Sequence, residues 1–199
     1  MIGKIGIIYQ DRNSREFLLG LRDRLNCEAE LIDPPAAIGI TRDLPRRQAN
    51  RAWAFFQKAG VDLVIRLTDS DGARWQEVRR EELGRVPEVA RSVWICGVAV
   101  NNLEDWLSGD PAHLARVLDA SASEIQNISN RTGVVKRLIS KKRSSREDSS
   151  DCVARIVRDA PSDVFRQWLN SNSLRQFYAD CRAAASCAGC ETANELDEA

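Results

Sequence analysis

The chain has 199 residues, the size of one large domain, and its 43% hydrophobic and 29% charged residues are ordinary for a globular protein. Its 29 lysines and arginines balance its 29 aspartates and glutamates, so only a local basic patch could attract nucleic acid. There is no run of about 18 apolar residues, so we expect no membrane span. The first residues lack a secretory cleavage site, so we expect a cytoplasmic protein with reduced cysteines.

The first hundred residues alternate between strand-like and helix-like segments. The strand-like segments are short apolar runs at residues 4–9, 27–32, 61–67 and 92–100. The helix-like segments between them lie at residues 14–25, 44–60 and 73–83. We expect Ser14 to cap the first helix and Gly60 to end the second. This alternation predicts an α/β fold in which a mostly parallel central sheet is flanked by helices.

After residue 100 the pattern is helical, and it predicts helices at residues 103–107, 111–118, 123–128, 152–157 and 164–185. Residues 131–146 are basic, with no acidic residue among them, and residues 144–150 are typical of a polar loop. We therefore expect an α/β core at residues 1–130, an all-helical basic extension packed on it at 131–190, and an acidic, disordered tail at 191–199.

Two aspartates follow the predicted strand at residues 61–67. Asp69 and Asp71 lie where open α/β sheets build their sites, and alternation puts both on one side of an extended chain. Two such carboxylates repel each other unless a proton or a divalent ion joins them, and oxygen ligands favour Mg²⁺ or Mn²⁺. The alternative is a plain loop in which Asp69 caps the next helix and Gly72 makes the turn.

Four segments resemble Toprim domains, and the resemblance touches most of the chain. Residues 5–18 resemble their opening strand, turn and helix, and residues 63–72 resemble the strand that ends in Asp-x-Asp. The most discriminating segment is 98–110, because it resembles the strand and Glu-x-Trp-Leu helix of stand-alone bacterial Toprim-like proteins. Residues 172–177 are similar to their C-terminal end.

The resemblance implies a Toprim-like fold that holds Mg²⁺ or Mn²⁺ against a phosphodiester. Asp69 and Asp71 match the Asp-x-Asp, and Glu104 matches the acid of the Glu-x-Trp segment. Gln10 stands where the first catalytic glutamate of the family is expected, and glutamine contributes no charge to a metal site. Asp11, one position later, is the possible substitute ligand.

The basic segment is a second candidate site. Phosphate contacts need only lysine and arginine within reach, so this segment predicts a nucleic-acid contact. Lys136 is singled out, because Toprim-like nucleases often use a lysine near the metals to stabilise developing charge. The alternatives are a solvated loop or a surface for a protein partner. The predicted contact residues are Arg131, Lys136, Arg137, Lys141, Lys142 and Arg143.

These observations lead to two hypotheses about function. The first is a metal-dependent nuclease component of a bacterial system, such as one for antiphage defence, which hydrolyses phosphodiester bonds in DNA or RNA, with DNA favoured. Its catalytic residues would be Asp69, Asp71, Glu104 and Lys136. The second is a degenerate Toprim-like subunit that binds nucleic acid or a partner ATPase of the ABC or SMC kind without cutting. The CxxC motif at residues 187–190 supplies too few ligands for a zinc site by itself.

Overall fold

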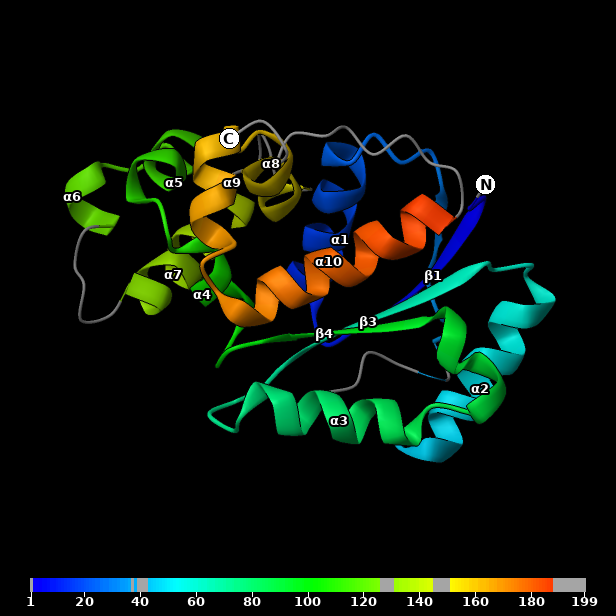
Figure 1. Cartoon of the computed structure of the whole chain (residues 1–199). Coiled ribbons are helices and arrows are strands. Elements are labelled where there is room, and N and C mark those ends of the chain that lie inside the picture. The colour runs from blue at the N-terminus through cyan, green and yellow to red at the C-terminus, as the bar shows by residue number, and fades with distance from the viewer. Residues whose placement is uncertain (1, 37, 39–42, 126–130, 145–150, 188–199) are drawn as a thin grey trace.

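The computed structural model describes residues 2–36, 38, 43–125, 131–144 and 151–187, in which four strands form a single parallel sheet (Figure 1). The strands stand in the order β2-β1-β3-β4, so β1 and β3 are the inner pair. The predicted α/β fold with a parallel central sheet is confirmed. The strands are β1 (Lys4–Tyr9), β2 (Glu30–Ile32), β3 (Leu63–Asp69) and β4 (Trp94–Ala99).

The register places the carboxyl ends of three strands at one edge. Tyr9 pairs with Leu67, and Asp69 pairs with Ala99. The residues that follow β1, β3 and β4 therefore emerge side by side, although they are far apart in the sequence. This edge is where open parallel sheets place ligands.

Helices cover both faces of the sheet (Figure 1). Side chains alternate along each buried strand, so both faces carry apolar residues that need to be covered. Helices α1 (Arg12–Arg24) and α10 (Asn172–Cys187) pack on the face that carries Ile7 and Ile65. Helices α2 (Arg46–Lys58) and α3 (Trp75–Arg85) pack on the face that carries Ile8 and Val64. Each face thus has its own apolar core.

Most helix boundaries follow the sequence pattern, with one correction at α1. Its N-cap is Asp11, not Ser14, because the main-chain N–H and the hydroxyl of Ser14 both donate to Asp11 Oδ1 at 2.8 Å. Aspartate is as good an N-cap as serine, and Asp11 stands directly before the first helical residue, Arg12. Helix α2 ends as predicted, and Gly60 follows it with a φ of 70°.

The second half is helical as predicted, but it is divided differently. The segment expected as one helix at residues 164–185 forms two, since the chain turns between α9 and α10, where the main-chain N–H groups of Asn170 and Ser171 donate to the carbonyls of Gln167 and Trp168. The basic segment forms helix α7 over most of its length, and the 3-10 helix η1 (Glu88–Val93) was not foreseen. Residues 145–150 and the tail at 191–199 lie outside the described residues. The other helices are α4 (Leu103–Leu107), α5 (Pro111–Leu118), α6 (Ala122–Ile125), α7 (Arg131–Ser144), α8 (Cys152–Arg158) and α9 (Ser162–Trp168).

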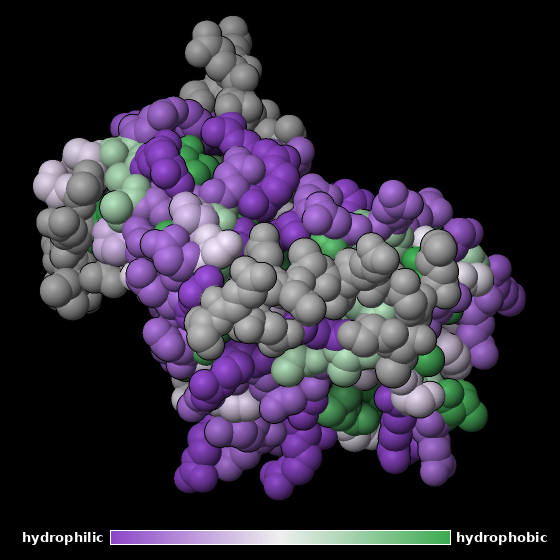
Figure 2. Space-filling view, turned by 45° about the horizontal axis from the view of Figure 1, so that its top comes forward, coloured by the Kyte–Doolittle hydropathy of each residue, from purple (hydrophilic) through white to green (hydrophobic). Residues whose placement is uncertain are grey.

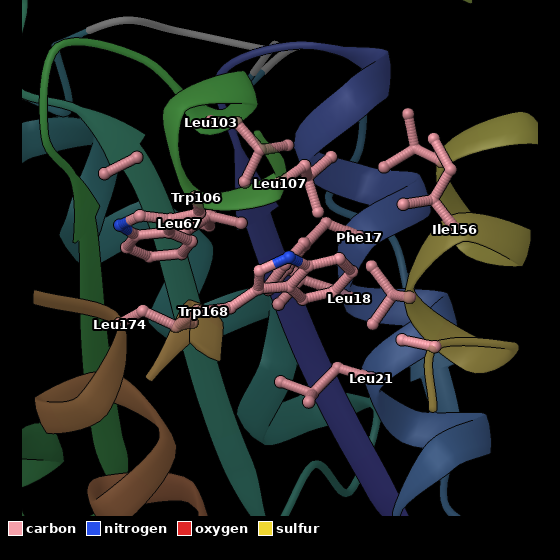
Figure 3. Packing of buried hydrophobic residues seen from close by; sticks show 14 of the residues in the cluster. Phe17, Leu18, Leu21, Leu67, Leu103, Trp106, Leu107, Ile156, Trp168 and Leu174 are labelled. Carbon is pink, nitrogen blue, oxygen red and sulfur yellow. The ribbon is translucent and has the colours of Figure 1, made fainter. Parts of the chain in front are cut away.

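The five-residue helix α4 is anchored by Trp106. Its ring lies between Phe17 of α1 and Phe177 of α10, with centroid separations of 5.5 and 6.1 Å. The indole N–H donates to the Ser173 hydroxyl at 2.8 Å. Figure 3 shows Trp106 and Phe17 within the same packed cluster as Trp168. A helix this short is not stable alone, so this packing fixes its position and that of its neighbour Glu104.

A buried carboxylate joins α1 to α7 and α8. Glu16 is 2% exposed, and its Oε1 lies 2.8 Å from both Arg12 Nε and Arg143 Nη2. Its other oxygen accepts a hydrogen bond from the main-chain N–H of Val153 at 3.0 Å. The helices after residue 130 therefore share both an apolar core and a buried ionic contact with α1.

The outer surface is largely hydrophilic on the face shown in Figure 2, although small apolar patches interrupt it. Across the described part of the chain, no helix is both long and apolar enough to cross a membrane.

The contact between α1 and α8 gives a direct test of this arrangement. A Cβ on Gly20 would lie 2.5 Å from the carbonyl oxygen of Ala154, so we expect Gly20→Ala to lower the free energy of unfolding by about 1–3 kcal/mol in urea denaturation. Gly84→Ala in α3 is the matched control, because its Cβ would meet open space. This control should be neutral or slightly stabilising, and equal losses in both variants would contradict the close packing.

Candidate functional site

Four carboxylates gather at the carboxyl edge of the sheet. Asp69 ends β3 and Asp71 follows it, while Asp11 comes after β1 and Glu104 after β4. Burial raises the pKa of Asp69 to about 7, and the charges of Asp11, Glu104 and Asp71 add to this rise. Lys136 acts in the opposite direction. The structure therefore brings the four predicted acids and the predicted lysine into one electrostatic environment.

The chain turns sharply after Asp69, which changes the expected placement of Asp71. Asp71 has a φ of 49° and is exposed, so the alternation of an extended strand does not continue to it. The main-chain N–H groups of Ser70 and Asp71 donate to the carbonyls of Ala99 and Asn101, which ties this turn to the end of β4. Asp69 does not cap α3, because the N-cap is Arg74 and makes no side-chain capping bond.

Glu104 faces the other acids from a buried position. The residue is 2% exposed, and Asn13 donates its side-chain amide to Glu104 Oε1 at 2.7 Å. Lys136 Nζ lies 3.6 Å from Glu104 Oε2. Both carboxylate oxygens therefore have a partner, one from α1 and one from α7. Asn13 was missed by the sequence analysis, because asparagine after a helix cap carries no distinguishing pattern.

Gln10 ties the ends of β1 and β3 together. Its Oε1 accepts hydrogen bonds from the Thr68 hydroxyl and from the main-chain N–H of Asp69, both at 3.0 Å. Because a main-chain N–H can only donate, the oxygen of the amide must face Asp69. A glutamate here could accept the same two bonds with one oxygen, and it would add a negative charge beside Asp69.

The donor set is made of oxygen atoms, which suits Mg²⁺ or Mn²⁺. Two further oxygens, Asn13 Oδ1 and Asn102 Oδ1, are buried without a hydrogen-bond partner among the described residues. As the side chains stand, however, no three aspartate, glutamate, histidine or cysteine residues in that part of the chain are grouped so that they could hold a metal ion. A cation at this edge would therefore require the carboxylates to move toward one another.

The basic residues of α7 divide into two groups. Lys136, Arg137 and Lys141 are exposed. Arg143 contacts the buried Glu16 and Lys142 contacts Asp119, so these two have structural partners that the sequence did not reveal. The side chain of Arg131 lies outside the described residues.

The single histidine has structural contacts, and most of the described cysteines are buried. His113, the sole histidine, is buried between the carbonyl of Ile156 at 2.8 Å and the guanidinium of Arg116 at 3.0 Å. Cys96 and Cys152 are buried as expected, whereas Cys27 is partly exposed. For the CxxC motif, Cys190 and the side chain of Cys187 fall outside the described residues.

Comparison of the chain with protein-family models, with curated proteins and with solved structures found no match. The fold and the site by themselves define an α/β protein with a parallel sheet, whose carboxyl edge carries an acidic cluster beside a basic helix.

The raised pKa of Asp69 predicts a pH-dependent stability. Between pH 3.8 and about 7 the folded protein keeps a proton on Asp69 that the unfolded chain releases, so the free energy of unfolding falls as the pH rises through this range. Asp69→Asn cannot ionise and should escape this loss. We expect the variant to gain on the order of 2 kcal/mol over wild type between pH 4 and pH 7.5, measured by urea denaturation in EDTA. A constant difference across the range would contradict the raised pKa of Asp69.

Proposed function

We propose that the chain is a Toprim-like protein that binds a divalent cation at the acidic cluster and cleaves phosphodiester bonds of nucleic acid. The observation that carries this proposal is the convergence of Asp11, Asp69, Asp71 and Glu104 with Lys136 at the carboxyl edge of the sheet. The resemblance of residues 63–72 and 98–110 to Toprim domains supports the same reading.

Each part of the cluster has a task in this proposal. Asp69, Asp71 and Glu104 would hold Mg²⁺ or Mn²⁺, with Asp11 as an additional acid, and the ion would neutralise phosphate charge and activate a water molecule. Lys136 would contact the phosphate, since its amino group lies at the junction of α7 and the acids. Arg137 and Lys141, both exposed on α7, would contact the nucleic-acid backbone.

The setting that we propose is a bacterial assembly in the cytoplasm that serves antiphage defence. The balanced net charge fits a subunit rather than a free DNA-binding protein, because no overall field attracts nucleic acid. We propose DNA as the substrate and an ATPase of the ABC or SMC kind as the protein partner.

A nuclease assay tests the proposal. Purified protein should cleave single- or double-stranded DNA when Mg²⁺ or Mn²⁺ is present and not in EDTA, and Asp69→Ala/Asp71→Ala should lower the rate at least about a hundredfold. The matched control is Glu81→Ala/Asp163→Ala, which removes the same charge from exposed positions and should retain the wild-type rate. Equal cleavage by the two double variants would rule out the acidic cluster as the active site.

Gln10→Glu tests the place of the missing acid. The added carboxylate should keep the hydrogen bonds to Thr68 and Asp69 and add one negative charge to the cation site. We expect about tenfold tighter Mn²⁺ binding in calorimetric titration, and a higher cleavage rate. Unchanged or weaker Mn²⁺ binding would show that this position does not face the cation.

A second candidate is a subunit that binds nucleic acid without cutting it. Two observations favour it: Gln10 is neutral, and Lys136 already compensates Glu104. In this case Mn²⁺ titration gives no heat, while labelled DNA still binds in EDTA and Arg137→Gln/Lys141→Gln weakens that binding. Metal-dependent cleavage would reject this candidate.

A further inference from the structure

Lys136 connects two features that otherwise lie apart. Its side chain is 51% exposed on the basic helix α7, yet Nζ lies 3.6 Å from Glu104 Oε2, whose side chain is only 3% exposed. Asn13 occupies the other oxygen of Glu104. The ammonium group thus stands where a cation would stand to reach Glu104, and it compensates a carboxylate that would otherwise be buried with an uncompensated charge.

The exposed half of Lys136 is open to a different anion. Arg137 and Lys141 are exposed on the same helix, so a nucleic-acid backbone along α7 would bring phosphate to all three side chains. One ammonium group cannot fully compensate both a phosphate and Glu104. Phosphate binding therefore weakens the ion pair between Lys136 and Glu104, and the charge of the Glu104 carboxylate is then compensated less.

We propose that Lys136 couples the two ligands: it occupies Glu104 in the free protein, and the phosphate of nucleic acid draws it away, so that Glu104 becomes available to a divalent cation. This inference rests on the proposed binding of cation and nucleic acid, and it adds that neither binds at full strength without the other.

The coupling must be reciprocal, because each ligand changes the affinity for the other by the same factor. We expect wild-type protein to bind a fluorescein-labelled DNA 12-mer about fivefold more tightly with saturating Mn²⁺ than in EDTA. The measurement is fluorescence anisotropy at constant ionic strength, with the DNA checked for cleavage on a gel. Without coupling, Mn²⁺ would leave the DNA affinity unchanged or lower it by competing for phosphate.

Lys136→Met removes the competing ammonium group and keeps most of the side-chain volume. We expect this variant to bind Mn²⁺ about fivefold more tightly than wild type in the absence of DNA. We also expect that Mn²⁺ no longer raises the affinity of this variant for DNA. Arg137→Met is the matched control, because it removes an equal charge from the neighbouring exposed position. It should weaken DNA binding but leave both the Mn²⁺ affinity and the coupling as in wild type.

The outcomes separate this inference from the proposed function. If wild type binds Mn²⁺ and DNA independently, or if Lys136→Met binds Mn²⁺ no better than wild type, the coupling is rejected while the cation site stands. If Mn²⁺ binds only to Lys136→Met or only in the presence of DNA, the coupling is supported. If no variant binds Mn²⁺ under any condition, both the coupling and the cation site are rejected.

Discussion

The contacts around the carboxyl edge of the sheet depend on one constraint, which is the repulsion between the carboxylates that lie there. The parallel register fixes where Asp69 emerges, and the following turns and helices bring Asp11, Asp71 and Glu104 near it. Each acid is accommodated differently. The pKa of Asp69 is raised to about 7, Asp11 caps α1, and Glu104 accepts a hydrogen bond from Asn13 and forms an ion pair with Lys136. The repulsion is thus reduced without being removed.

The other buried carboxylates in the described chain show what full compensation looks like. Glu16 accepts hydrogen bonds from Arg12 and from the main-chain N–H of Val153, and it forms an ion pair with Arg143. Glu82 contacts Arg66 at 3.2 Å and Arg85 at 2.7 Å. At the edge of the sheet, by contrast, burial and three neighbouring acids raise the pKa of Asp69 to about 7, and Lys136 opposes this rise only in part. Incomplete compensation of charge in one place is typical of a functional site rather than of a structural ion pair.

The sequence predicted the fold well because the fold depends on local patterns. Short apolar runs bounded by turn residues marked the strands, and proline and glycine marked the ends of α2. The site was harder. Asp69 and Asp71 stood out from their place after a buried strand, and Glu104 stood out from the resemblance to Toprim domains. The contacts of Glu104 with Asn13 and of Arg143 with Glu16, however, join residues more than thirty positions apart. Only the placement of α4 and α7 beside α1 brings such partners together, and no periodicity of the sequence encodes it.

Gln10 shows how one position can serve the fold and the chemistry separately. Its carbonyl oxygen fastens the end of β1 to that of β3 through Thr68 and Asp69, and a carboxylate oxygen could do the same. The structural task is therefore indifferent to the choice between glutamine and glutamate, whereas the charge at the edge is not. Glutamate here would add a negative charge next to Asp69, whose pKa is already raised by burial and by the neighbouring acids. Glutamine avoids that repulsion in the free protein. In the site that we propose, it also leaves the attraction for a cation to Asp69, Asp71 and Glu104, while Lys136 supplies the positive charge beside Glu104 as long as no cation is bound.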